Sequence, residues 1–154
     1  MQNAFTTLRI VHIALLSGMA AFNIVSLILV KQGFPAMDES VQRAFQVVCI
    51  LISTVCLAAG FQLFKKKMMA ARNSIESGEK RMALYKTACI LWWAMIEAPG
   101  ILAGIGFIMT SNYAFFALAL FHLLVILIFT PRKANIIVLL NLNSEEVKRL
   151  EGVS

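Results

Sequence analysis

Four long runs of apolar residues, separated by charged or turn-forming segments, make up most of the chain. They cover residues 8–30, 44–64, 88–110 and 113–129. A bilayer core of about 30 Å takes roughly 20 apolar residues in a helix, so each run has about the length of one membrane span. The pattern predicts an all-α integral membrane protein. It would consist of a four-helix bundle over residues 1–130 and an amphipathic cytoplasmic tail over residues 131–154.

The composition agrees with this fold class. Of the 154 residues, 60% are hydrophobic and 14% are charged, and the mean hydropathy is +0.80. Soluble domains have about 25% charged residues. Four spans leave no room for a separate soluble catalytic domain. The first run ends at Lys31 without the small-residue pattern of a signal-peptide cleavage site, so we expect it to remain as an anchor.

The 14 basic residues are distributed unevenly, with only Lys31 and Arg43 on one side of the predicted bundle. Basic residues beside membrane spans are retained in the cytoplasm. The distribution therefore predicts two cytoplasmic termini in the inner (plasma) membrane. The twelve residues on the cytoplasmic side are Arg9, Lys65, Lys66, Lys67, Arg72, Lys80, Arg81, Lys86, Arg132, Lys133, Lys148 and Arg149.

Basic residues directly at the ends of spans are also candidates for contact with lipid headgroups. The net charge of +6 is then explained by topology and by a lipid bilayer partner. Nucleic-acid binding is not predicted, because no basic domain exists apart from the spans. The headgroup candidates are Lys65, Lys66, Lys67, Arg132 and Lys133.

The cytoplasmic segments carry helix start and stop signals. Between the second and third runs we expect two helical extensions joined near Ser77 and Gly78. In the tail, Thr130 and Pro131 are placed as an N-cap and first helical residue of an interfacial helix. Asn143 or Ser144 then caps a last short helix. This final helix is interpreted either as a docking site or as a solvated terminus.

Small residues four positions apart predict where helices approach closely in lipid. We expect such contacts at Gly18, which lies four residues after Ala14, and at Gly60, which lies four residues after Cys56. Gly100 and Gly104 form a third pair with the same spacing. The pattern does not decide whether one of these surfaces also joins a second copy. A homo-oligomer, or a place in a larger membrane complex, is therefore expected.

Glu97 is the only acidic residue inside a predicted span. An acidic side chain near the bilayer centre costs roughly 2.5 to 3.5 kcal/mol on insertion scales. It is therefore protonated, paired, or in contact with a water-filled path. One interpretation is that Glu97 binds and releases a proton or a cation. The other is that it makes a structural hydrogen bond to Ser17 or Asn23 of the first span.

The two histidines, His12 and His122, are candidates for taking part in either role of Glu97. His122 is predicted within one helical turn of the depth of Glu97, so the two could form a proton relay, since histidine titrates near neutral pH. Alternatively, a neutral His122 forms a hydrogen bond to a backbone carbonyl or to Glu97. His12 is expected near the cytoplasmic interface, where its ring can reach water. Haem ligation by His12 and His122 is a further alternative.

A polar motif precedes Glu97: Ala71-Arg72-Asn73-Ser74-Ile75-Glu76, then Gly78-Glu79-Lys80-Arg81, then Ala94-Met95-Ile96-Glu97-Ala98. These segments resemble the polar loop and carboxylate-bearing helix of the proteolipid, or c, subunits of rotary ATP synthases. The resemblance covers about residues 71–110. It implies that Glu97 is the ion-binding carboxylate and that Arg72 and Glu76 are loop positions. Ser74 stands where that family usually has proline, which points to a distant or convergent use of a membrane carboxylate.

No motif for catalysis or metal binding is present. The chain has no Ser/His/Asp set, nucleotide-binding glycine loop or HExxH sequence, and its three cysteines form no CxxC pair. We therefore expect no enzyme activity, no catalytic residues and no metal. The predicted function is a small membrane subunit or carrier in which Glu97, with His122, handles a proton or cation. The alternative is a scaffold in which Glu97 and His122 stabilise the bundle and the basic loop and tail dock a partner.

Overall fold

The protein is entirely α-helical over the residues that its structure, a computed structural model, describes: 1–33 and 38–152. Four longer helices are followed by two short ones. They are α1 (Gln2–Lys31), α2 (Glu39–Arg72), α3 (Gly78–Thr110), α4 (Tyr113–Ile128), α5 (Lys133–Leu140) and α6 (Ser144–Glu151). The all-α prediction is confirmed.

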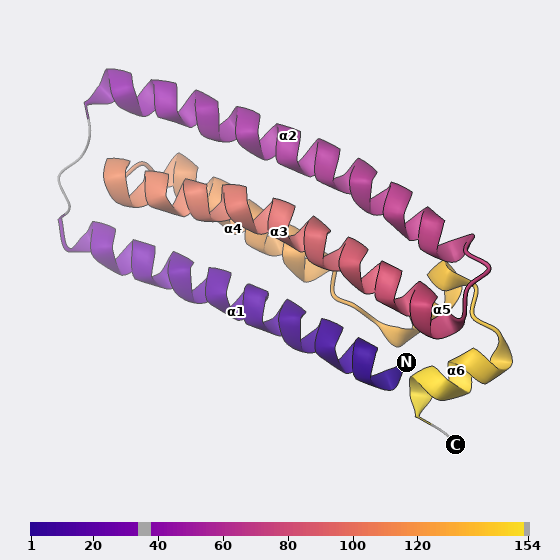
Figure 1. Cartoon of the computed structure of the whole chain (residues 1–154). Coiled ribbons are helices and arrows are strands. Elements are labelled where there is room, and N and C mark those ends of the chain that lie inside the picture. Colours follow the sequence, from indigo (N-terminus) through magenta and orange to yellow (C-terminus); the bar gives the residue numbers. More distant parts are fainter. Residues whose placement is uncertain (34–37, 153–154) are drawn as a thin grey trace.

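α3 is the central helix of the molecule. It packs against α1, α2 and α4, whereas α1 and α2 lie on opposite sides of it and make no extensive contact with each other in the described residues (Figure 1). α4 packs on α3 and on α1. The arrangement is therefore more open than a regular four-helix bundle, in which every helix has two neighbours.

Three helices, α1, α2 and α3, are long and apolar enough to cross a membrane. α4 has 16 residues and is followed by a bend of 72° into α5, and the two helices together reach the length of a fourth candidate span. Exposed apolar side chains cover the outer faces of α1 and α2, for example Ile24 and Val55. Lipid tails are the environment in which such faces are stable.

The ends of the chain meet at one end of the molecule. The N-terminus, the turn between α2 and α3, and the tail helices α5 and α6 lie together there, and the last turn of α1 and the first turn of α2 lie at the other end (Figure 1). α2 and α3 extend toward this end beyond their apolar portions and are joined between Arg72 and Gly78. The expected helical extensions are therefore present.

The tail differs in detail from the prediction. Thr130 is not the N-cap of α5, because its hydroxyl donates back to the Leu127 carbonyl and extends the end of α4. The helix begins two residues later than predicted, after an extended Arg132. The start of α6 agrees with the prediction: Asn143 is its N-cap and forms a reciprocal capping box with Glu146.

The predicted glycine contacts fall into two groups. A Cβ added at Gly60 would lie 2.9 Å from the Trp92 ring, and one at Gly100 would lie 2.9 Å from His122 Cβ, so both glycines are sites of close helix approach. Gly104 is covered by the ring of Phe22 of α1. Gly18 is different, because a Cβ there would meet nothing within 4 Å. Gly18 therefore lies on an outer surface of α1.

Candidate functional site

Glu97 lies on α3 between a buried row of residues and an exposed row. On one side, Trp93, Gly100 and Gly104 contact α1, through His12, Met19 and Phe22 respectively. On the other side, Ala94, Ala98 and Ile101 are exposed on the face of α3 that is left open between α1 and α2. Glu97 is consequently half-buried, at the edge of the contact between α1 and α3.

The carboxylate of Glu97 has no hydrogen-bond or ion-pair partner among the described residues. Ser17, one of its two predicted partners, is exposed. Asn23, the other, is 4% exposed, and its amide oxygen accepts no hydrogen bond. The structural interpretation requires a hydrogen bond to a neighbouring helix, and no such bond is formed in this part of the chain.

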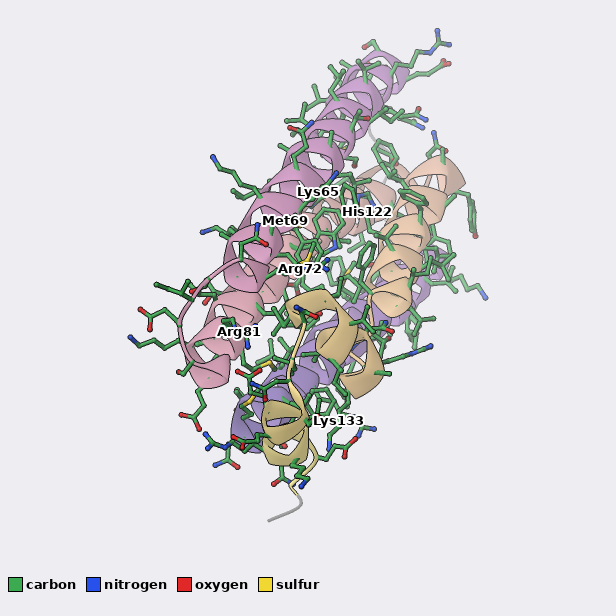
Figure 2. The ribbon with its side chains drawn as sticks, turned by 90° about the vertical axis from the view of Figure 1, so that its right-hand side faces the viewer. Lys65, Met69, Arg72, Arg81, His122 and Lys133 are labelled. Atoms are coloured by element: carbon green, nitrogen blue, oxygen red, sulfur yellow. The ribbon has the colours of Figure 1, made fainter. Side chains whose placement is uncertain are left out.

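His122 does not pair with Glu97. Its Nδ1 lies 2.9 Å from the Leu118 carbonyl one turn earlier in α4, and its Nε2 is buried without a partner. The side chain packs against Gly100 and is completely enclosed between α4 and α3. Figure 2 shows His122 within the helices rather than on their outer surface. The hydrogen bond to a backbone carbonyl is the arrangement that was predicted as an alternative to a proton relay.

His12 is buried instead of reaching the membrane interface. It is 2% exposed, its Nε2 lies 3.0 Å from the Ile126 carbonyl of α4, and its ring meets Trp93 at 4.9 Å between centroids. The expectation that His12 lies near water was therefore wrong. The imidazole joins α1 to α4 across a sequence separation of 114 residues.

The described geometry does not favour haem ligation by the two histidines. His12 lies at the level of Trp93 on α3, and His122 lies at the level of Gly100. Seven residues of helix separate these levels by about 10 Å along the axis. Two axial ligands of one iron would have to face each other at one level.

The adjacent tryptophans Trp92 and Trp93 both belong to the buried core. Trp92 is 3% exposed and packs with Phe61, Phe64 and Phe129. Trp93 is enclosed on the opposite side of α3, against His12. Adjacent residues on a helix diverge by about 100°, so the two rings fill the separate contacts of α3 with α2 and with α1.

A second polar site, which the sequence did not predict, fixes the tail to the start of α3. The Arg81 guanidinium donates to both carboxylate oxygens of Glu146, at 2.6 Å each, and to the Leu140 carbonyl at 2.8 Å. The two side chains are only 12% and 14% exposed. Leu150 of α6 is completely buried. The last helix thus docks on its own chain, and its predicted role as a solvated terminus was wrong.

The surroundings of Glu146 favour its ionised form. Burial acts to raise the pKa of Glu146. The hydrogen bonds from Arg81 and from the Asn143 and Gly78 backbones, with the charge of Arg81, outweigh burial and bring the pKa below its ordinary value. Gly78 is the first residue of α3, so the carboxylate also meets the positive end of that helix.

Acidification is expected to release α6. Because the pKa of Glu146 is lowered in the folded state, the contact contributes fully above the ordinary value of 4.5 and is lost as the pH falls through the lower folded-state value. A nitroxide attached at Lys148→Cys should become mobile over that acidic range. Glu146→Gln should be mobile already at neutral pH. Glu145→Gln, which changes an exposed neighbour, should behave like the unchanged chain, and equal mobility in all three would contradict the assignment.

The described residues contain no group of three or more His, Cys, Asp or Glu side chains that could hold a metal ion. Comparison of the chain with protein-family models, with curated proteins and with solved structures found no match. The site is therefore interpreted from its own geometry, in which Glu97 is an acidic group in the apolar part of α3 without a partner among the described residues.

Proposed function

We propose that the chain is a small multi-pass membrane subunit or carrier that binds a proton or a cation at Glu97. The observation that carries this proposal is the position of Glu97: half-buried on the central helix, at the edge of an open face, and without a partner among the described residues. A carboxylate in the apolar part of a bilayer is stable only when it is protonated or matched by a cation. Among the residues that the structure describes, no Lys, Arg or His side chain supplies that match.

The proposal includes a topology. α4 is the fourth, short span, and α5 lies in the membrane interface after the 72° bend. The end of the molecule that carries the N-terminus, the turn between α2 and α3, and the tail also carries twelve of the 14 basic residues. By the positive-inside rule this end faces the cytoplasm of a cell with the protein in its inner membrane.

Labelling with dicyclohexylcarbodiimide tests the proposal, because this reagent attacks protonated carboxyl groups in apolar surroundings. In lipid nanodiscs, Glu97 should be labelled, and the extent of labelling should fall several-fold as the pH is raised. Addition of Na⁺ at constant ionic strength should protect Glu97 if the bound ion is a cation. It should have no effect if the bound ion is a proton.

Two variants serve as controls. Glu97→Gln keeps the size of the side chain but cannot exchange a proton, so it should remove both the label and the pH-dependent carboxylic acid band in the infrared spectrum. Glu79→Gln removes an exposed carboxylate at the start of α3 and should change neither. Absence of labelling at every pH, together with an infrared titration that Glu97→Gln leaves unchanged, would refute ion binding at Glu97.

A further inference from the structure

A long groove runs between α2 and α4 on the side of α3 opposite Glu97. It exists because α2 packs on α3 and α5, whereas α4 packs on α3 and α1, so the two helices leave space between them. The groove has a volume of about 570 Å³. Its walls are mainly apolar, with Ile50 and Phe61 from α2, Leu118 and Phe121 from α4, and Trp92 at its base. The hydroxyl residues Ser53 and Thr54 also line it.

A second hollow continues the groove toward the end of the molecule that holds the tail. Its volume is about 290 Å³, and Phe129 lines both spaces. This hollow lies between α2, α3 and the bend from α4 to α5. Its lining combines apolar residues, such as Phe64 and Leu139, with the polar Tyr85, Arg132 and Asn135.

The flank of α2 that borders the groove ends in basic residues. Phe61, Lys65 and Arg72 follow one another at spacings of four and seven, which places them on one side of a helix. Figure 2 shows Lys65, Met69 and Arg72 along the flank of α2 that faces α5, and these two helices are in contact. Both basic side chains are exposed.

These basic residues have no acidic counterpart nearby. Lys65, Arg72 and Arg132 form no ion pair within the described residues, and neither hollow is lined by Asp or Glu. Lys133 is excluded from the group, because its ammonium lies over the ring of Phe5, 5.6 Å from the centroid. The polar end of the groove is therefore a cationic site, and its charge calls for an anionic group.

We infer that the groove binds one anionic phospholipid of the cytoplasmic leaflet, with an acyl chain between α2 and α4 and its phosphate at Lys65, Arg72 and Arg132. The length supports this occupant. From Ile50 to Phe61 the groove follows α2 for about 16 Å, which is about half of the ~30 Å hydrocarbon core and so the depth of one leaflet. Guanidinium groups are suited to two-point bonding of phosphate oxygens.

The inference does not depend on ion binding by Glu97, which lies near α1 on the other side of α3. A zwitterionic lipid is a poorer match, because its positive headgroup would meet Arg132 in the lining of the second hollow and the exposed Lys65 and Arg72 on the neighbouring flank of α2. No carboxylate lines either hollow. A soluble phosphate ester could occupy the basic end alone, but it would leave the apolar groove empty. The experiment below separates these occupants.

Native mass spectrometry of the full chain in detergent can test the site with two lipids of identical acyl chains, phosphatidylglycerol and phosphatidylcholine. We expect phosphatidylglycerol to be retained at one copy and with at least tenfold preference. Removal of the three basic groups in Lys65→Gln/Arg72→Gln/Arg132→Gln should abolish the preference. Removal of three exposed charges elsewhere, in Lys31→Gln/Arg43→Gln/Lys148→Gln, should leave it within twofold.

A pair of substitutions on neighbouring residues tests the acyl-chain part of the site. Ala58 lines the groove, and the exposed Ala59 next to it does not. Ala58→Trp should reduce retention of phosphatidylglycerol at least fivefold, and Ala59→Trp should not. Equal binding by the two tryptophan variants, displacement of the lipid by glycerol phosphate, or equal loss in both triple variants would each overturn the inference.

Discussion

Arg81→Ala is expected to detach α6 from the start of α3 and to destabilise the end of the protein that carries the tail by about 3 kcal/mol, as when one partner of a buried ion pair is removed. The substitution leaves the Glu146 carboxylate largely enclosed without its cation and also removes the bond to the Leu140 carbonyl. Hydrogen exchange of the α6 amides should rise to the rate of an unprotected segment.

The control and the double variant make this result specific. Arg149→Ala removes an exposed arginine of the same helix and should leave exchange unchanged. Arg81→Met/Glu146→Met removes both charges, and its loss of stability should be smaller than the sum of the two single losses, because no charge remains buried alone. If α6 stays protected in Arg81→Ala, the ion pair is not what fixes the tail.

Gly100→Leu should lower stability more than any other single glycine substitution on α3, because overpacking in a tightly packed contact costs about 1 to 3 kcal/mol. A Cβ at this position would lie 2.5 Å from Met19 Cε of α1 and 2.9 Å from His122 Cβ of α4. The methionine end can move aside, but a Cβ atom can move only with its helix. α4 would therefore have to move away from α3, and the Met19 side chain of α1 would have to rearrange.

Gly18→Leu is the matched control for that prediction. Gly18 is also a glycine in the middle of a long apolar helix, but nothing lies within 4 Å of an added Cβ. Thermal unfolding of both variants in the same detergent should show a clear decrease for Gly100→Leu and no decrease for Gly18→Leu. Equal midpoints for the two variants would mean that the contacts of α3 with α1 and α4 are not tight in the membrane.

The sequence predicted which segments are helical better than it predicted how they pack. Apolar runs and charged ends locate α1 to α4 because hydrocarbon excludes charges and unpaired backbone groups alike. The same runs do not distinguish lipid-facing from buried residues, since lipid is as apolar as a protein core. Gly18 and Gly100 therefore look alike in sequence, although only Gly100 contacts other helices.

The predictions of site residues were limited for the same reason, because the sequence does not show which residues pack together. Glu97 was recognisable because a carboxylate within a span is rare, and the structure leaves it without a described partner. His12 bonding to the Ile126 carbonyl could not be predicted, because a backbone carbonyl carries no sequence signal. Arg81 and Glu146 are 65 residues apart. Only the fold shows which of the many charged residues at this end meet.

The central place of α3 has a consequence for biosynthesis. Domains form from the N-terminus as the chain is made, so α1 and α2 enter the membrane before their common partner has left the ribosome. Since they make no extensive contact with each other in the described residues, they have little of their own chain to pack against at that stage. The native structure can therefore assemble only after α3 has been made. A nascent chain that ends between α2 and α3 contains two membrane helices that are not packed against each other.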